Sequence, residues 1–343
     1  MNKRGLLAVI SILALLVISV FFIFLISQKP VCNDGTVYNS CSSVKPFFCF
    51  QGKLIENSSF CGCSNLSEAE GTGCISQYEQ GAKNIILNYT LNGVDGQINF
   101  TVYKKMDDHL SSLPRYMQYN PNETSVLLDF KLRSIDDPNQ KELLMPLVAD
   151  IQNLAKDKDD QARIAVSLVQ NIPFGSSNKT ISFGGIGITY YRYPYEVLYD
   201  MNGVCGEKSE LLAFLLRELG YDSAFIYYSA ENHEALGIKC PVQKSLNDSG
   251  YCFIETTGPS IISDSQTQYV GIGALVSTPQ IIPVPDGNLS VFGKNDFYEY
   301  NDAKLFDSIK ERSDKYGTIN FVQHLQYESL KKKYGLVEYI YTF

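Results

Sequence analysis

The sequence predicts an α+β protein with one transmembrane helix, a small disulfide-rich module, and a core in which a cysteine begins a central helix that packs on an antiparallel sheet. Three observations predict this organisation. Residues 5–27 form an uncharged run, six cysteines fall within residues 32–74, and "NGVCGEKSELLAFLLRELGY" at 202–221 is followed by three strand-like segments. The expected parts are an anchor at 1–29, a cysteine-rich module at 30–76, a β-hairpin and helical part at 77–150, an α+β core at 151–265, and C-terminal strands and helices at 266–343.

The uncharged run at 5–27 predicts a membrane anchor. Serine is its only polar residue type, and ~20 apolar residues of helix span a bilayer core. A cleaved secretory signal is the alternative, but the apolar region of such signals is normally ~7–15 residues long. Lys3 and Arg4 precede the run, and basic residues favour the cytoplasmic side. We therefore expect a single-pass cell-membrane protein with a cytoplasmic N-terminus and with residues 30–343 outside the cytoplasm.

Cysteine usage favours an oxidising compartment. The six cysteines of residues 32–74 come without histidine or a C-x-x-C pair, which favours disulfides over a zinc site and leaves their connectivity open. Two more flank "PVQKSLNDSGY", an expected hairpin tip. The disulfide candidates are Cys32, Cys41, Cys49, Cys61, Cys63, Cys74, Cys240 and Cys252. Cys205 is left without a predicted partner. It is interpreted as a reactive thiol, as one half of an intermolecular disulfide, or as an inert core cysteine.

The remaining composition limits the partners of the predicted ectodomain. Without Lys3 and Arg4 the chain has 27 basic and 37 acidic side chains, a net charge of about −10, which argues against nucleic acid. No glycines stand in a strand–GxGxxG–helix setting, and Asp157, Asp159 and Asp160 lack the glycine and terminal glutamate of a calcium loop. We therefore expect no cofactor and no metal. Candidate glycosylation tripeptides begin at Asn57, Asn65, Asn88, Asn99, Asn122, Asn178, Asn247 and Asn288.

Hydrophobic periodicity places the elements of the core. An alternating run at 83–106 around a glycine-containing turn predicts a hairpin, and residues 182–203 are interpreted as a loop-rich approach to Cys205. Helices are expected at 143–155, 157–172, 206–219, 302–317 and 321–335. Strands are expected at 223–230, 234–240 and 250–257, forming an antiparallel sheet against the 206–219 helix.

Cys205 has candidate partners for nucleophilic chemistry. A helix N-terminus stabilises a thiolate through its free N–H groups and dipole. Of the three histidines, His109 and His324 lie in polar helical segments and are interpreted as surface residues, whereas His233 begins a predicted strand beside the cysteine helix. A histidine there suits an imidazolium–thiolate pair. Glu255 on the next strand is the candidate that orients the imidazole.

The motifs around these residues resemble a known superfamily. "NGVCGEKSELLAFLLRELGYDSAFIYY", "ENHEALGIK" and "CFIETT" follow one another as in the transglutaminase-like branch of the papain-like cysteine hydrolases, and "DDQARIAVSLVQNIPF" resembles the helix that precedes the cysteine there. The chain is most similar to membrane-anchored archaeal members. It departs from the family pattern in having Glu255 where an aspartate is usual, and Glu234 and Ala235 where an aromatic residue follows the histidine.

The resemblance implies a papain-like, transglutaminase-like fold and acyl transfer through a thioester. Cys205 would attack a carboxamide, His233 would protonate the leaving amine, and Glu255 would hold the imidazolium. The oxyanion donors would be the Cys205 N–H and a side chain of the approach loop; the donor and groove candidates are Tyr190, Tyr191, Tyr193 and Tyr195. We expect a peptidase or amidase acting on peptide or protein substrates outside the cell. Glutamine–lysine crosslinking, and a catalytically inactive binding or adhesion module, are the alternatives.

Overall fold

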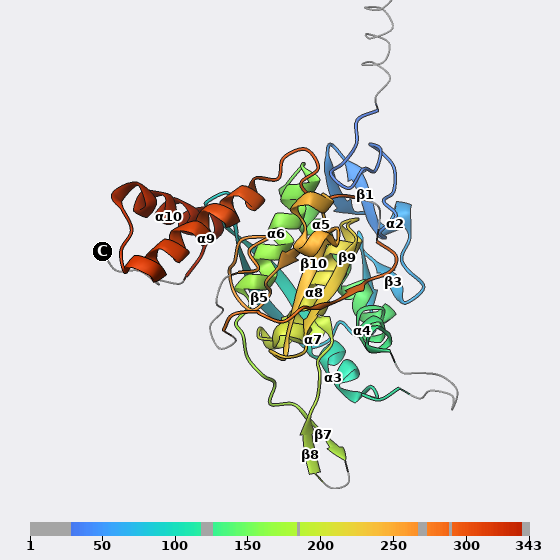
Figure 1. Cartoon of the computed structure of the whole chain (residues 1–343). Coiled ribbons are helices and arrows are strands. Elements are labelled where there is room, and N and C mark those ends of the chain that lie inside the picture. Colours follow the sequence, from blue (N-terminus) through green and yellow to red (C-terminus); the bar gives the residue numbers. More distant parts are fainter. Residues whose placement is uncertain (1–28, 118–125, 184–185, 267–272, 288–289, 338–343) are drawn as a thin grey trace, which may run out of the picture. The chain divides into compact units, whose positions relative to one another are not determined.

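The computed structural model describes residues 29–117, 126–183, 186–266, 273–287 and 290–337 (Figure 1). The predicted anchor, apart from residue 29, lies outside these ranges. Within them, no helix has the length and apolarity needed to cross a membrane. The described chain is a mixed α/β structure with disulfides, and it divides into two compact units, residues 29–63 with 69–74 and residues 64–68 with 75–337.

Three disulfides hold the first unit together. They join Cys32 to Cys49, Cys41 to Cys61, and Cys63 to Cys74. Phe47 and Leu54 are buried between them, a small core of the kind that covalent cross-links commonly support. The elements up to residue 76 are β1 (Phe47–Phe50), β2 (Lys53–Glu56), α2 (Ser58–Cys61), β3 (Ser67–Glu70) and β4 (Gly73–Ser76).

The second unit begins with the expected hairpin, β5 (Ala82–Leu91) and β6 (Val94–Tyr103). Its two-residue turn is Asn92–Gly93, and both residues have positive φ, 52° and 77°. An Asn–Gly pair fits this turn because it tolerates positive φ at both positions. Apolar residues alternate along both strands, and one face packs against α6 (Lys158–Asn171).

Helices follow the hairpin in the chain and lead to the cysteine. They are α3 (Lys104–Ser112), α4 (Leu127–Ile135), α5 (Pro138–Leu154), α6, α7 (Pro194–Asp200) and α8 (Cys205–Glu218). Asp137 and Asp157 cap α5 and α6 by accepting hydrogen bonds from first-turn N–H groups, as such residues commonly do.

The approach to Cys205 is more regular than the sequence predicts. Residues 182–203 were expected to be rich in loop, but they contain part of a hairpin, β7 (Thr180–Phe183) with β8 (Ile186–Thr189), and the helix α7. Pro194 is the first residue of α7, and a proline is favoured there because its missing N–H would be unpaired in any case.

A four-stranded antiparallel sheet carries the other candidate residues. Its order is β11 (Tyr251–Ile254), β10 (His233–Lys239), β9 (Ser223–Tyr228) and β12 (Gln280–Pro283). The first three correspond to the expected strands, and β12 falls in the 266–343 part, where strands were expected without stated bounds or pairing. The helix α8 packs on β9 and β10 (Figure 1). Between β10 and β11 lie two short 3₁₀ turns, η1 (Val242–Lys244) and η2 (Leu246–Asp248), and the Cys240–Cys252 disulfide closes this excursion.

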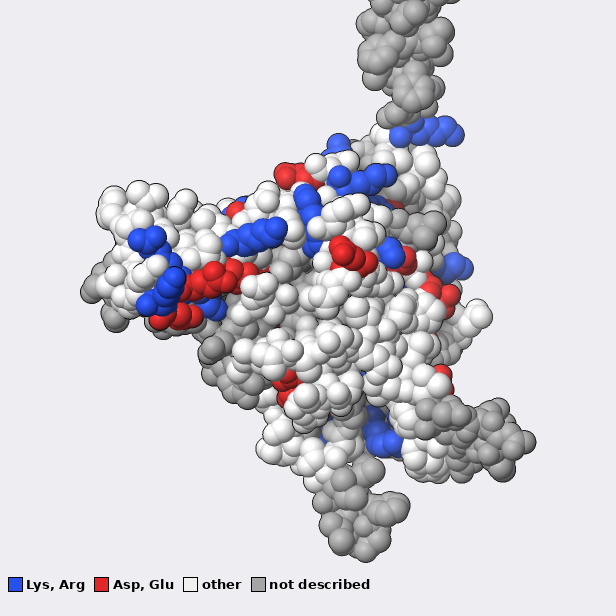
Figure 2. All heavy atoms as spheres, in the orientation of Figure 1, with Lys and Arg blue, Asp and Glu red and all other residues white. Residues whose placement is uncertain are grey.

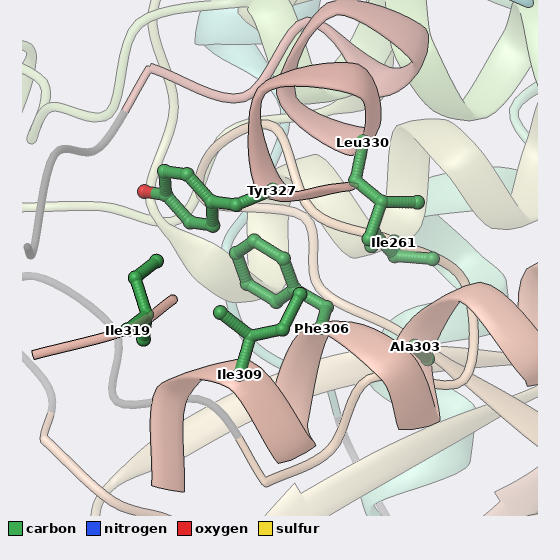
Figure 3. Close-up of a cluster of buried hydrophobic side chains, with 7 residues drawn as sticks. All are labelled: Ile261, Ala303, Phe306, Ile309, Ile319, Tyr327 and Leu330. Carbon is green, nitrogen blue, oxygen red and sulfur yellow. The ribbon is translucent and has the colours of Figure 1, made fainter. Parts of the chain in front are cut away.

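The chain ends in two helices, α9 (Tyr298–Tyr316) and α10 (Phe321–Tyr334). Figure 3 shows their shared apolar cluster, in which the rings of Phe306 and Tyr327 stack with centroids 5.5 Å apart. Acidic and basic side chains lie next to one another on these helices (Figure 2), and Lys333 pairs with Asp302 at 2.7 Å.

Candidate active site

Cys205 is the first residue of α8 and carries a free, half-buried thiol. The residue before it, Val204, offers no side-chain acceptor to the helix, whereas Ser, Thr, Asp or Asn commonly caps this position. First-turn N–H groups have no intrahelical partner. The first-turn N–H groups of α8 are therefore available as hydrogen-bond donors next to the Cys205 thiol.

His233 and Glu255 meet next to this helix end. Continuing the β10–β11 register, which pairs Leu236 with Ile254, places Glu255 opposite Ala235 and on the same sheet face as His233. The His233 Nε2 and Glu255 Oε2 atoms are 2.8 Å apart, and each residue is only 1% exposed. This contact leaves Nδ1 as the ring nitrogen for the hydrogen bond between His233 and the Cys205 side chain.

The surroundings favour the charged form of His233. Burial lowers the pKa of the imidazole, but hydrogen bonds to Cys205 and Glu255, and the negative charge of both partners, outweigh burial and raise the pKa from 6.5 to about 9. An imidazolium next to a thiol is the arrangement that activates cysteine nucleophiles.

Glu255 is held by the backbone that follows it. Its Oε1 accepts hydrogen bonds from the Thr256 N–H at 3.0 Å, the Thr257 N–H at 2.8 Å and the Thr257 hydroxyl at 2.7 Å. The other oxygen accepts from His233. The longer side chain of glutamate folds back onto its own turn, so a glutamate reaches the histidine here with both oxygens bonded.

Thr256 ties this turn to the cysteine. Its hydroxyl lies 3.2 Å from the Cys205 carbonyl oxygen and 3.1 Å from the Ser209 hydroxyl, and Thr256 is fully buried. The end of β11 and the first turn of α8 are therefore bonded directly. Sequence reasoning did not assign Thr256 a role, because a threonine after a glutamate carries no distinctive pattern.

A buried ion pair fixes the loop before Cys205. The Arg192 guanidinium donates to Glu207 at 2.7 Å, to Asp200 at 3.0 Å and to the Asn202 side chain at 2.8 Å. Glu207 also accepts from the Val204 N–H at 3.0 Å. Bidentate arginine contacts impose geometry as well as attraction, so these groups hold the Cys205 end of α8 in place.

Of the four tyrosine candidates, the structure brings Tyr191 to the cysteine. Its hydroxyl lies against the first turn of α8, where a Cβ at position 206 would collide with it, so Gly206 leaves room for this contact. Lys131 donates to the Tyr191 oxygen at 2.8 Å. Tyr191 as a whole is 41% exposed, but its hydroxyl lies against Lys131 and Gly206. Loss of solvent at the hydroxyl and the nearby carboxylates of Glu210 and Glu234 raise the pKa of Tyr191 well above its usual 10. The hydroxyl therefore keeps its proton and remains a hydrogen-bond donor.

The other three tyrosines are buried. Tyr190 donates to Glu196 at 2.9 Å, the Tyr193 N–H before α7 donates to Glu196 at 2.9 Å, and the Tyr195 hydroxyl accepts from the Tyr103 N–H at 2.7 Å. Tyr191 differs from them in being 41% exposed and in contacting Gly206, and both features are visible once the fold is known.

Lys208 lies beneath the site, fully buried. Burial lowers its pKa from 10.5 to about 7, with the charge of Glu255 opposing the shift. Its amine donates to the backbone carbonyls of Gln170, Ile172 and Thr257. Lys208 therefore connects α6, α8 and the turn that holds Glu255.

The remaining candidates lie away from this centre. The eight disulfide candidates are all bonded, which leaves Cys205 as the free cysteine. His109 is half-buried and stacks on Tyr78 with ring centroids 4.6 Å apart, and His324 lies on α10. In the ranges that the structure describes, no cluster of His, Cys, Asp or Glu has the arrangement of a metal site.

Comparison with known proteins adds little to this geometry. No family model matches the chain, and no curated protein matches its sequence. Among solved structures, LapG of Legionella pneumophila is similar at 12% identity with a TM-score of 0.24, over 39% of this chain and 75% of LapG. Its calcium-bound structure is similar at 11% identity with a TM-score of 0.27, over 52% and 98%. Such slight likeness carries no argument about fold or activity.

Proposed function

We propose that this protein is a transglutaminase-like cysteine hydrolase that cleaves peptide or isopeptide carboxamides through a thioester. The observation that carries the proposal is the His233–Glu255 contact of 2.8 Å, with His233 also bonded to the one cysteine that forms no disulfide in the described chain. Nucleophile, base and orienting group thus lie in the order that nucleophilic catalysis requires.

Acylation begins with the thiolate of Cys205. It attacks the carbonyl carbon, a C–S bond forms, and the carbonyl oxygen becomes an oxyanion. The imidazolium of His233 then donates its Nδ1 proton to the amide nitrogen, the C–N bond breaks, and the amine leaves. Glu255 keeps the imidazole oriented through Nε2, as the acid of a catalytic triad does.

The oxyanion would be stabilised by two donors. One is the backbone N–H of Cys205 at the start of α8, and the other is the hydroxyl of Tyr191, which is protonated and lies against Gly206. Donors fixed before the reaction stabilise developing charge without reorganisation, and removing one such donor commonly lowers kcat by about 10²–10³-fold.

Water completes the cycle. Neutral His233 takes a proton from water as the water oxygen attacks the thioester carbon, a C–O bond forms and the C–S bond breaks. The acid product leaves, and the thiolate–imidazolium pair is restored. We propose water rather than a lysine amine as the acceptor, because an enzyme exposed to solvent meets water in excess.

The proposed location is the outer face of the cell membrane. Four disulfides suit an oxidising compartment, and the uncharged run at 5–27 suits an anchor.

The test is to incubate the purified full-length protein with a peptide library and, separately, with casein and a fluorescent primary amine. The hydrolase proposal predicts new peptide termini that disappear in Cys205→Ser and in His233→Gln but persist in His109→Gln, the matched histidine control. Amine incorporation without cleavage would instead establish crosslinking. Absence of both reactions with a folded protein would leave a binding module.

A further inference from the structure

A cavity of about 400 Å³ opens beside the candidate active site. Tyr191 forms part of its wall and reaches Gly206 with its hydroxyl. Glu210 also lines it, and this residue follows Cys205 in the same helix by five positions, roughly 7.5 Å along the axis. The cavity therefore adjoins the position of a substrate bound at Cys205, and its volume lies in the range of ligand pockets, with room for a substrate side chain.

The wall of the cavity combines aromatic rings with guanidinium groups. Phe130, Tyr190 and Tyr193 line it together with Arg115 and Arg133. The Arg115 guanidinium lies over the rings of Tyr190 and Tyr193, 4.2 and 4.5 Å from their centroids. Arginine held against aromatic faces is pre-oriented for hydrogen bonding.

Both guanidinium groups have an Nε–H that makes no hydrogen bond with the described residues. The Arg115 side chain is 8% exposed and donates through Nη2 to Glu196 and to the Leu110 carbonyl, but its Nε–H has no acceptor in the described chain. The buried Nε–H of Arg133 also lacks an acceptor among the described residues, and Arg133 forms no ion pair with them. Both Nε atoms are enclosed, so a ligand in the cavity does not reach them. It meets the partly exposed Arg133 side chain, whose charge makes the cavity wall complementary to an anion.

The charge of the cavity also favours an anion. The acidic residue that lines the cavity, Glu210, pairs with Lys131 at 3.1 Å. Burial nevertheless raises the pKa of Glu210 to about 7. Lys131 is shared with Glu234 at 2.8 Å. The negative groups are thus compensated or partly protonated near neutral pH, whereas Arg133 has no compensating carboxylate within the described ranges.

We propose that this cavity is a substrate subsite for an acidic side chain, a glutamate close to the scissile bond of the peptide. The methylene stem of the glutamate lies along the tyrosine rings, and its carboxylate accepts from Arg133. This subsite deepens the proposed hydrolase function and rests on it. It also selects against lysine or arginine at the same substrate position.

The test measures how fast acetylated tripeptide acyloxymethyl ketones modify Cys205 in the full-length protein, followed by intact mass. One position at a time carries Glu, Gln or Lys, and the other positions are Ala. At one position we expect the Glu probe to react about tenfold or more faster than the Lys probe, as a charge-assisted contact permits. The preference falls to less than about threefold in Arg133→Gln, which removes the charge that the ligand carboxylate meets.

Controls separate the possible failures. Lys304→Gln removes an exposed charge outside the cavity and keeps the preference, and melting temperatures establish that each variant is folded. Equal rates for Glu, Gln and Lys probes at every position, with Cys205 still labelled by iodoacetamide at pH 6, would overturn the subsite and leave the hydrolase intact. Loss of both kinds of labelling in folded wild-type protein would overturn the hydrolase proposal and the subsite with it.

Discussion

His233 and Glu255 leave the ends of two neighbouring strands and meet at 2.8 Å, each almost completely enclosed. The carboxylate is bonded through both oxygens, and buried polar groups need such partners to be tolerated. The pair is therefore already assembled in the free protein, and it holds a proton on the imidazole next to Cys205.

Replacing Glu255 with glutamine should lower the pKa of His233. The amide removes the negative charge that helps to raise the pKa of His233 from 6.5 to about 9, so we expect the pKa to fall by at least about one unit. An NMR titration of the His233 ring measures it directly. Glu231→Gln, which removes a carboxylate bonded to Ser277, should leave the titration unchanged. An unaltered value in Glu255→Gln would show that the carboxylate does not control the imidazole.

His233 should also make stability depend on pH. Its pKa is raised on folding, so its contribution to the free energy of unfolding is complete below about 6.5 and is lost as pH rises through about 9. Lys208, whose pKa is lowered to about 7, has the opposite dependence. The difference between wild type and His233→Gln isolates the histidine. Urea unfolding should show this difference shrinking by roughly 3 kcal/mol between pH 6 and pH 9.5; a constant difference would contradict the assignment.

Loss of the Tyr191 hydroxyl should lower kcat strongly but leave the reactivity of the Cys205 thiol almost unchanged. Tyr191→Phe removes the proposed oxyanion donor, and Gly206→Ala drives a methyl group into its place. We expect kcat to fall by about 10²-fold in both variants, while the alkylation rate of Cys205 changes little. Tyr298→Phe is the matched control, because that hydroxyl bonds to Asn92 and the residue does not line the cavity. Equal activity of Tyr191→Phe and wild type would exclude the donor role.

The Arg192–Glu207 pair should be a large contributor to stability. Arg192→Met leaves the Glu207 carboxylate buried without its partner, a change that commonly costs about 3–5 kcal/mol. Arg217→Met breaks a pair with the half-exposed Asp136 and should cost about 1 kcal/mol or less. Denaturant unfolding of both variants checks the contrast, and similar losses would mean that the buried pair does not fix the loop.

The sequence predicts the strongly periodic parts of the fold well. The helix expected at 206–219 is α8, because its leucines recur at helical spacing, and the strands expected after it are β9, β10 and β11. The strand β12 is four residues long and pairs with β9 from a distant part of the chain. Such a short segment has too little pattern to be recognised without its partner.

Some residues of the candidate site could likewise be predicted from the sequence, and others could not. Cys205, His233 and Glu255 were nominated from motif order, and the structure places them together. Lys131 reaches the site from α4, more than seventy residues before Cys205, and no local pattern connects the two. Tertiary packing alone brings this lysine to Tyr191 and the adjoining cavity.

The most direct test of the central claim is the pH profile of Cys205 alkylation in the folded, non-reduced protein. An isolated cysteine titrates near ~8.5, whereas cysteines paired with an imidazolium react at much lower pH. The proposed triad predicts rapid iodoacetamide labelling of Cys205 that persists at pH 6, is lost in His233→Gln and is retained in His109→Gln. Labelling that rises only toward pH 8–9 and is indifferent to His233 would contradict it.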